Sequence, residues 1–267
     1  MLTGNSDGAD FGNASILRNV TSNVGWRMPK AGGAMQLDVI NNYTNNWQGR
    51  TIRIDQYDFA LNHIGNYYNG GGLTNTAERP DKKMFAMTTN ATMSPQIYDN
   101  DNFVDPTNRA TGYPATPSDG WYQFPDDITS PDPILPEWWV GSQLPLQGQA
   151  PTILAASTLE AELLPKVGAC EYLDDNGAVQ FYRDALDDSL LAYITNDNAG
   201  SRLSDTLYQG LAEAIVMPTN TRPGGFYVSS PDIPEAYYLA NVSPNLATDI
   251  APSGYTFLEE YLNQVDL

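Results

Sequence analysis

The sequence of 267 residues predicts an all-β protein with helices toward its C-terminal end, in which the strands form a parallel β-helix. Short segments of alternating apolar residues, such as Met35–Ile40, end in asparagine-rich turns. The asparagines recur at positions 19, 42, 66 and 102, with spacings of 23, 24 and 36 residues, and each precedes an apolar or aromatic residue. Such a strand-and-turn repeat indicates a solenoid, because each unit buries its apolar face only by stacking on its neighbours.

Asparagine is suited to the corner between two such strands. Its backbone tolerates left-handed geometry, and its side-chain amide can bond along a stack of like amides. We therefore expect Asn19, Asn42 and Asn66 to occupy equivalent corners of successive parallel rungs. The alternative is that the recurring asparagines are unrelated strand ends in a β-sandwich.

The alternating pattern continues through Thr51–Asp105, which we interpret as further rungs. The single histidine, His63, lies there between apolar neighbours. No Ser or Cys nucleophile motif accompanies it, so it is interpreted as a packed or surface residue rather than a catalytic one.

A different composition begins at Pro106 and lasts to Pro151. Prolines and glycines interrupt every run, and tryptophans and other aromatic residues are interspersed. This composition excludes a helix but is too aromatic for simple disorder, so we expect an ordered loop region lying across the side of the rungs. Within it, Trp138 and Trp139 either stack on sugar rings or pack against the rungs.

Helices are expected beyond this loop region. Ser157 to Glu160 has the pattern of a capping box. Asp184 is placed to cap a second helix, whose apolar stripe includes Leu190, Leu191 and Ile194. We therefore divide the chain into rungs with their loop region at 1–150 and a helical C-terminal extension at 151–267.

The charge of the chain restricts its partners. It carries 13 Lys and Arg against 32 Asp and Glu, a net charge of −19. This balance argues against nucleic acid or an anionic membrane as the main partner. No apolar run is long enough for a transmembrane helix, and Met1–Asn5 does not have the basic start and apolar core of a signal peptide.

Positive charge is concentrated in the first rungs. The cationic residues there are Arg18, Arg27, Lys30, Arg50 and Arg53. Arg27 and Arg50 are one repeat apart, so stacking of the rungs would place them on one face. An acidic ligand would bind at this face rather than at the acidic remainder of the surface.

The same stretch carries a family resemblance. Its motifs are Arg27-Met28-Pro29-Lys30, Gly32-Gly33, Asn41-Asn42 and Asn46-Trp47, in that order, with Ile64–Tyr68 following. Met1–Asp7, Arg183–Asp187 and Gly254–Asn263 add matches near both ends. Together these motifs resemble the polysaccharide lyase family 1 pectate lyases over nearly the whole chain.

The resemblance implies a right-handed, single-stranded parallel β-helix of the pectin lyase-like kind and a secreted enzyme. Such an enzyme cleaves polygalacturonate by β-elimination, with calcium neutralising the substrate carboxylate. Arg27 matches the family's catalytic base, and Lys30, a candidate clamp for the substrate carboxylate, stands where one version of the family's motif has an arginine. Arg50 is a further candidate for substrate binding. An arginine acts as a base only where neighbouring cations and desolvation disfavour its charged form.

The resemblance also suggests that this chain is the C-terminal portion of the fold, truncated at its N-terminal end. The family's calcium ligands and a substrate-binding lysine lie upstream of the segment that Met1–Asp7 matches, so no metal ligand is assigned here. The alternative is a natural short form. Two function classes stay open: a pectate lyase, and a non-catalytic β-helix that binds glycans, for example in adhesion to a cell or as part of a phage particle.

The sequence leads to a prediction on activity. Preorganised electrostatic groups typically supply factors of about 10²–10³ each, so a chain without several of them should be near background. We expect residues 1–267 alone to show little or no cleavage of polygalacturonate, and an N-terminal complement of the same enzyme to restore it. Absorbance of the unsaturated uronate product measures this, and robust calcium-dependent cleavage by the isolated chain would contradict it.

Overall fold

The computed structural model describes part of the chain, in the ranges 2–4, 12–25, 27–32, 35–47, 49–55, 58–71, 74, 85–89, 94–106, 115–125, 132–146, 150–167, 171–173, 179–181, 183, 185–195, 248–252 and 256–257. The chain divides into two compact units. The first is Met1–Val167 with Leu190–Ser204, and the second is Gly168–Ser189 with Asp205–Leu267.

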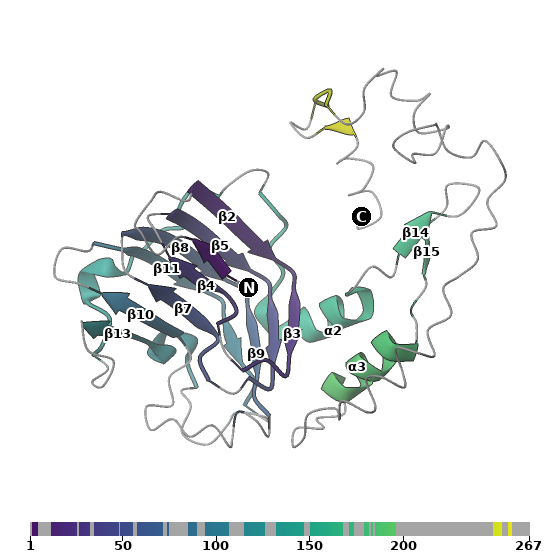
Figure 1. Ribbon diagram of the computed structural model, residues 1–267, viewed down its shortest axis with the longest axis horizontal. Coiled ribbons are helices and arrows are strands. Elements are labelled where there is room, and N and C mark those ends of the chain that lie inside the picture. The colour runs from purple at the N-terminus through teal and green to yellow at the C-terminus, as the bar shows by residue number, and fades with distance from the viewer. Residues whose placement is uncertain are drawn as a thin grey trace. The chain divides into compact units, whose positions relative to one another are not determined.

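Three parallel sheets make up the first unit (Figure 1). Sheet A has the strand order β1 (Leu2–Gly4), β4 (Lys30–Gly32), β7 (Ile52–Asp55), β10 (Phe85–Thr89) and β13 (Trp121–Pro125). Sheet B consists of β2 (Gly12–Leu17), β5 (Met35–Ile40), β8 (Phe59–Ile64) and β11 (Gln96–Asn100). Sheet C consists of β3 (Val20–Ser22), β6 (Tyr43–Asn45), β9 (Tyr67–Asn69) and β12 (Phe103–Val104).

The chain visits the three sheets in rotation. Consecutive strands lie in different sheets, and each strand pairs in parallel with the strand three places later in the sequence. We call one passage through sheets A, B and C a rung, for example β4, β5 and β6. The mostly parallel all-β architecture is as predicted, and the sandwich alternative is wrong for these strands because sandwich sheets are antiparallel.

The corner between sheets B and C has the same two-residue form in every rung. Its first residue has a left-handed backbone, and its second is an asparagine. The first residues are Arg18 (φ 52°), Asn41 (φ 53°), Gly65 (φ 64°) and Asp101 (φ 50°). Gly, Asn and Asp adopt this conformation more readily than other residues. The prediction that Asn19, Asn42 and Asn66 occupy equivalent corners is confirmed.

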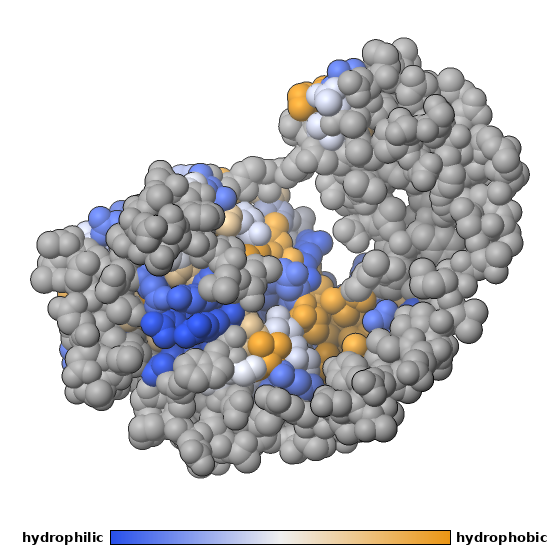
Figure 2. All heavy atoms as spheres, in the orientation of Figure 1, coloured by the Kyte–Doolittle hydropathy of each residue, from blue (hydrophilic) through white to orange (hydrophobic). Residues whose placement is uncertain are grey.

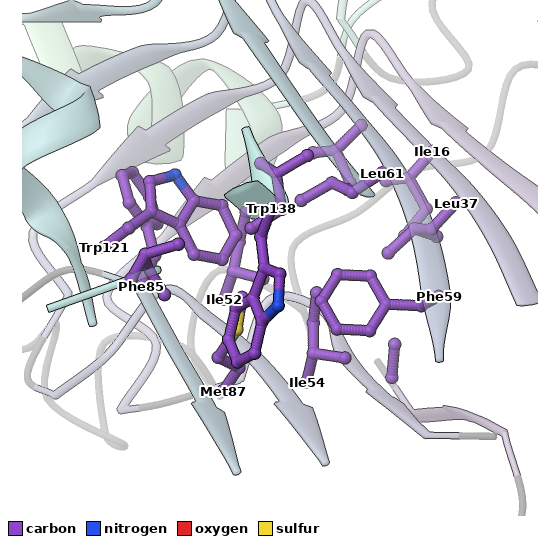
Figure 3. Packing of buried hydrophobic residues seen from close by; sticks show 14 of the residues in the cluster. Ile16, Leu37, Ile52, Ile54, Phe59, Leu61, Phe85, Met87, Trp121 and Trp138 are labelled. Carbon is purple, nitrogen blue, oxygen red and sulfur yellow. The ribbon is translucent and has the colours of Figure 1, made fainter. Parts of the chain in front are cut away.

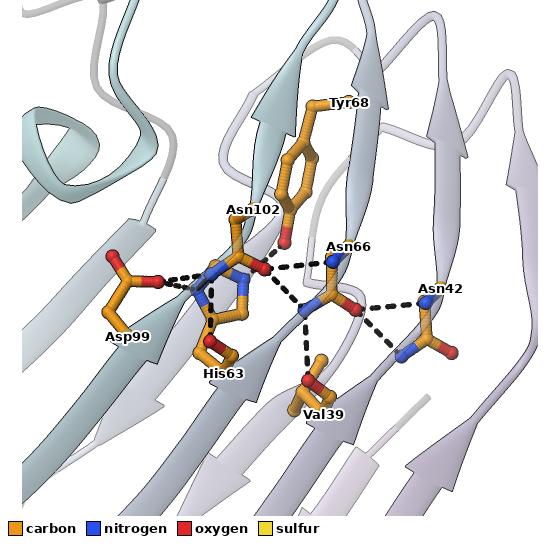
Figure 4. A network of polar contacts seen from close by, with 7 residues as sticks. All are labelled: Val39, Asn42, His63, Asn66, Tyr68, Asp99 and Asn102. Carbon is orange, nitrogen blue, oxygen red and sulfur yellow. Dashed lines mark hydrogen bonds and ion pairs between the residues drawn. The ribbon is translucent and has the colours of Figure 1, made fainter. Parts of the chain in front are cut away.

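The side-chain amides of these corners form a ladder (Figure 4). Asn42 accepts bonds at Oδ1 from the backbone N (3.0 Å) and Nδ2 (3.2 Å) of Asn19. Asn66 Oδ1 accepts the same pair from Asn42 at 2.9 and 3.1 Å. Asn102 Oδ1 accepts it from Asn66 at 2.9 and 2.8 Å. Each corner is thereby tied to the next through both backbone and side chain.

The inward faces of the strands meet in one apolar core (Figure 3). Alternation places every second side chain of a strand inside. The core contains, among others, Leu37, Ile52, Ile54, Leu61, Phe85, Met87 and Ile97, each at most 2% exposed. Trp138 also belongs to this core, and Trp139 packs against it. Of the two arrangements expected for these tryptophans, the structure therefore has the one in which they pack against the rungs.

His63 is completely buried inside the rungs. Its Nε2 lies 2.5 Å from the Tyr68 hydroxyl, and its Nδ1 lies 2.7 Å from an Asp99 carboxylate oxygen. Burial, and secondarily the charge of Asp99, raises the pKa of Tyr68, which keeps that hydroxyl protonated. Asn102 donates to the backbone carbonyl of His63 at 2.7 Å. The histidine is a packed residue, as interpreted from the sequence.

Residues 139–145 of the predicted loop region lie against sheet B, whereas 121–125 form strand β13 of sheet A, which the loop prediction missed. Val140 N donates to the Ile97 carbonyl at 3.0 Å. Asn62 exchanges two bonds with the backbone of Leu144, at 3.0 and 3.1 Å. The expectation of an ordered segment across the side of the rungs is confirmed for these residues.

Short helices cover the outer face of sheet C. They are η3 (Ala156–Thr158), α2 (Leu159–Leu163) and η4 (Leu164–Lys166). The leucines of α2 and η4 pack on Tyr43 and Tyr67, whose rings stack at 5.0 Å between centroids. The Tyr43 hydroxyl donates to Glu160 at 2.9 Å.

The predicted capping box at Ser157 is wrong. The N-cap of α2 is Thr158, and no side chain caps the helix. Ser157 lies inside the preceding 3₁₀ turn, so its hydroxyl is not at the N-cap position. Glu160 is the acceptor for Tyr43 instead of the partner of a capping serine.

The second unit contains an antiparallel pair, β14 (Glu171–Leu173) and β15 (Val179–Phe181), which the helical prediction for this extension missed. The predicted second helix is present as α3 (Ala185–Thr195), within which the chain passes from one unit to the other. Asp184 and most of Gly254–Asn263 lie outside the described residues. Among the helices that the structure describes, none has the length and hydropathy to cross a membrane.

The amide ladder leads to a stability prediction. Replacing Asn66 by Ala removes the side-chain partner of the Asn42 backbone N–H and of the Val39 carbonyl in the buried corner, and leaves Asn102 Oδ1 with the backbone N–H alone. The free energy of unfolding should fall by about 2–4 kcal/mol, because each buried polar group left unsatisfied costs about 1–3 kcal/mol. Urea unfolding monitored by circular dichroism measures this. Asn100→Ala, at an exposed position of β11, is the control and should change stability little; an equal loss in both variants would contradict the ladder's role.

Candidate functional site

The outer face of sheet A gathers charged side chains. In β7, Ile52 and Ile54 are buried in the core, so Arg53 and Asp55 point outward. In β4, Lys30 pairs with Arg53 and Gly32 pairs with Asp55. The most hydrophilic described surface in Figure 2 lies over these two strands.

The repeat places a second pair of cations beside this one. Arg27 N donates to the Arg50 carbonyl at 2.9 Å, so the two arginines hold equivalent backbone positions in neighbouring rungs. Three residues further on in each rung come Lys30 and Arg53, which are also paired. The predicted stacking of Arg27 and Arg50 is therefore confirmed for the backbone. We call Arg27, Lys30, Arg50 and Arg53 the cationic array.

Arg27 stands at a bend rather than in a strand. Its φ of 67° is left-handed, and the Met28–Pro29 peptide after it is cis. A non-glycine residue with this backbone marks a constrained position, of a kind that is common at functional sites. Arg27 therefore precedes β4, whose first residue is Lys30. The alternation of inward and outward side chains along β4 does not extend back to Arg27.

Asp55 joins the two outward cations of the array. Its Oδ2 lies 2.7 Å from Lys30 Nζ, and its Oδ1 accepts from Arg53 Nε at 2.5 Å. Partial burial acts to raise the pKa of the Asp55 carboxyl, but the hydrogen bonds and positive charges of Lys30 and Arg53 outweigh it. The pKa therefore lies below its ordinary value, and the carboxylate is ionised at neutral pH.

The candidate residues differ in accessibility. The side chains of Lys30 and Arg53 are 27% and 23% exposed, so solvent and solutes reach them. Arg27 is also partly exposed. Arg50 is only 5% exposed, which leaves little of it for contact with a ligand.

Sequence reasoning assigned no role to Arg53 or Asp55. The alternation Ile52-Arg53-Ile54-Asp55 does signal that both point to one face. The pairing of Asp55 with Lys30 depends on the register of β4 against β7, which the alternation alone does not give.

Calcium is implied by the family resemblance, and we tested whether the described residues fit it. Calcium takes six to eight oxygen ligands, usually from several carboxylates. Within the part of the chain that the structure describes, no group of three or more Asp, Glu, His or Cys side chains is placed to hold a metal. Asp55, beside the array, already binds two of its cationic side chains, Lys30 and Arg53. These residues do not fit calcium, so no step below is derived through it.

Comparison with known proteins adds no further assignment: no protein-family model and no curated protein matches the chain. A proposal on function is therefore argued from the cationic array and from the motifs around it.

The Asp55 cluster leads to a prediction on pH. Because the folded-state pKa is lowered, the cluster stabilises the protein above the ordinary aspartate pKa of about 3.9, and this contribution is lost as the pH falls through the folded value. Both partners are partly exposed, so the contribution should be below about 1 kcal/mol. Lys30→Met should raise the Asp55 pKa toward its ordinary value in a carbon-13 NMR titration of the carboxyl. Lys166→Met, in η4, is the control, and an unchanged Asp55 midpoint in Lys30→Met would contradict the pairing.

Proposed function

We propose that the first unit is a right-handed parallel β-helix whose cationic array binds an acidic polysaccharide, of which polygalacturonate is the type, and that the chain belongs to a secreted pectate lyase-like enzyme. The handedness is supported by the general rule that crossover connections between parallel strands are right-handed in almost all proteins. The rotation of the chain through three parallel sheets is compatible with this fold.

The observation that carries the proposal is the pairing of Lys30 with Arg53 on the outer face of sheet A, with Arg27 and Arg50 stacked through their backbones three residues earlier in the same two rungs. The net charge of −19 repels anionic polymers in general. A polyuronate therefore needs a local cationic surface, and the array offers one with matched positions in neighbouring rungs. Regular spacing of charge suits a ligand that itself carries a carboxylate on every sugar.

In this proposal Arg27 removes the proton from C5 of a uronate. The electron pair of the C5–H bond forms a C4–C5 double bond, and the C4–O4 bond breaks with its electron pair going to the oxygen of the leaving sugar, which takes a proton from water. A left-handed, constrained backbone at Arg27 supports a fixed position for the base.

Lys30 is proposed to contact a substrate carboxylate, and Arg50 is proposed to support binding through its charge. Lys30 is partly exposed, so a substrate carboxylate can replace Asp55 as its partner. Lys30 then forms a new ion pair in place of the one that it loses. Arg50 is mostly covered, so its contribution is to the positive potential at Arg27 more than to direct contact.

A second candidate is a non-catalytic β-helix that binds glycans. It is favoured by the ion pairs of the array, since Lys30 and Arg53 are already neutralised in part by Asp55. A surface of this kind supports moderate binding without chemistry. The two candidates share the site and differ only in whether Arg27 takes a proton.

Cleavage and binding measured together distinguish the candidates. The chain, alone and mixed with the N-terminal calcium-binding rungs of a family member, is assayed on polygalacturonate for unsaturated uronate and by calorimetry for binding. For the lyase, Arg27→Ala should lower the rate by about 10²-fold or more and leave affinity within a few fold. Arg183→Ala in the second unit is the matched control and should have no effect.

Binding without cleavage in every mixture would favour the glycan-binding candidate. Cleavage that is indifferent to Arg27→Ala would overturn the assignment of the base. Absence of both binding and cleavage would overturn the proposed function as a whole.

A further inference from the structure

One carboxylate lies between two cations of the array. Asp55 binds Lys30 through Oδ2 at 2.7 Å and Arg53 through Oδ1 at 2.5 Å, so each oxygen has its own partner. The two cations belong to neighbouring strands at paired positions. Opposite Asp55 on β4 is Gly32, which has no side chain to stand between the carboxylate and Lys30. Asp55 therefore links two rungs on the surface where the ligand is proposed to bind.

This link is exchangeable. The side chains of Lys30 and Asp55 are 27% and 25% exposed, and ion pairs with this much access to water are weak and readily replaced. The Asp55 carboxylate is ionised at neutral pH, since its two partners lower the pKa of this carboxyl below its already acidic ordinary value. It thus occupies the position that a carboxylate of a bound ligand would take.

Tethering gives Asp55 an advantage over a dissolved carboxylate. A group held within the same molecule competes as if present at about millimolar concentration or above. A single uronate has to exceed this to displace Asp55. A chain of uronates can displace Asp55 at a lower concentration. Its other carboxylates bind the array at Arg27 at the same time, so the carboxylate that replaces Asp55 is itself tethered.

We propose that Asp55 is a specificity-determining residue, which competes for Lys30 and Arg53 and so makes the outer face of sheet A select polyuronates over single uronates. This inference rests on the proposed function in that the preferred ligand is a polyuronate. The competition itself concerns any anion that reaches Lys30 and Arg53.

Calorimetry with galacturonate and tetragalacturonate tests the inference on the full chain. Asp55→Asn removes the charge and keeps the shape, so galacturonate should bind about three- to tenfold more tightly. Tetragalacturonate should gain less, and the ratio of the two affinities should fall. Asp55→Glu keeps the charge and should keep the wild-type ratio, whereas a merely structural role predicts that the longer Glu disturbs binding more than Asn does.

Glu162→Gln is the matched control for net charge. Glu162 lies in α2, on the sheet C side, where its carboxylate accepts from Thr158 Oγ1 at 2.8 Å, a bond that the Gln carbonyl can retain. This variant should leave the affinity ratio unchanged. A fall of the ratio equal to that in Asp55→Asn would overturn the inference, because it would report overall charge alone.

Sulfate and dextran sulfate, a single anion and a polyanion without uronates, separate the two proposals. If no variant binds uronates but Asp55→Asn gains affinity for sulfate, the role of Asp55 holds and the polyuronate function fails. If uronates bind the wild type and Asp55→Asn with the same ratio, the role of Asp55 fails and the function holds. If no anion binds any variant, both are overturned.

Discussion

The whole arrangement of the first unit depends on the hydrogen bonds that tie each asparagine corner to the next. Backbone and amide groups are both used, as at Asn42 and Asn66. A parallel pairing has no hairpin to set its register, so the register has to be fixed elsewhere. The ladder does this at the corner between sheets B and C, and the strands on either side inherit the alignment. A slip by one residue would turn the core side chains to the outside.

The surface chemistry follows from the same constraint. Register aligns not only core residues such as Ile54 but also the outward residues of the next rung. Cations that are 23 positions apart in the sequence become neighbours in space, as Lys30 and Arg53 do. Asp55, which is paired with Gly32 rather than with another acidic residue, then has two cationic partners instead of one. A repeat that exists to stack apolar side chains thereby also determines how charges are grouped on the face that solutes reach.

The parts of this architecture that are local and periodic were open to prediction from the sequence. The asparagine corners were found because one residue type recurs with one backbone requirement. Contacts that depend on distant segments were not found: the bond between Asn62 and Leu144 links residues that no local pattern relates. The capping box failed because a 3₁₀ turn precedes α2, a choice that depends on packing.

Other misses had a signal that was not used. The strands β14 and β15 flank Asn176-Gly177, a dipeptide typical of tight hairpins, with alternating apolar residues on both sides. At the candidate site the array itself was visible in the spacing of Arg27, Lys30, Arg50 and Arg53. The burial of Arg50 was not, since it depends on what covers the side chain in the folded protein.

The unequal length of the rungs has a consequence for how such a protein changes. The corner at Asn102 is as short as that at Asn42, although the repeat leading to it is 36 residues instead of 23. The added length falls at other connections, such as 70–84 between β9 and β10, against 46–51 between β6 and β7. Insertions are thus tolerated at one edge of each rung and excluded at another. Evolution and engineering can lengthen the loops beside sheet A, where the cations lie, while the amide corner keeps every later rung aligned.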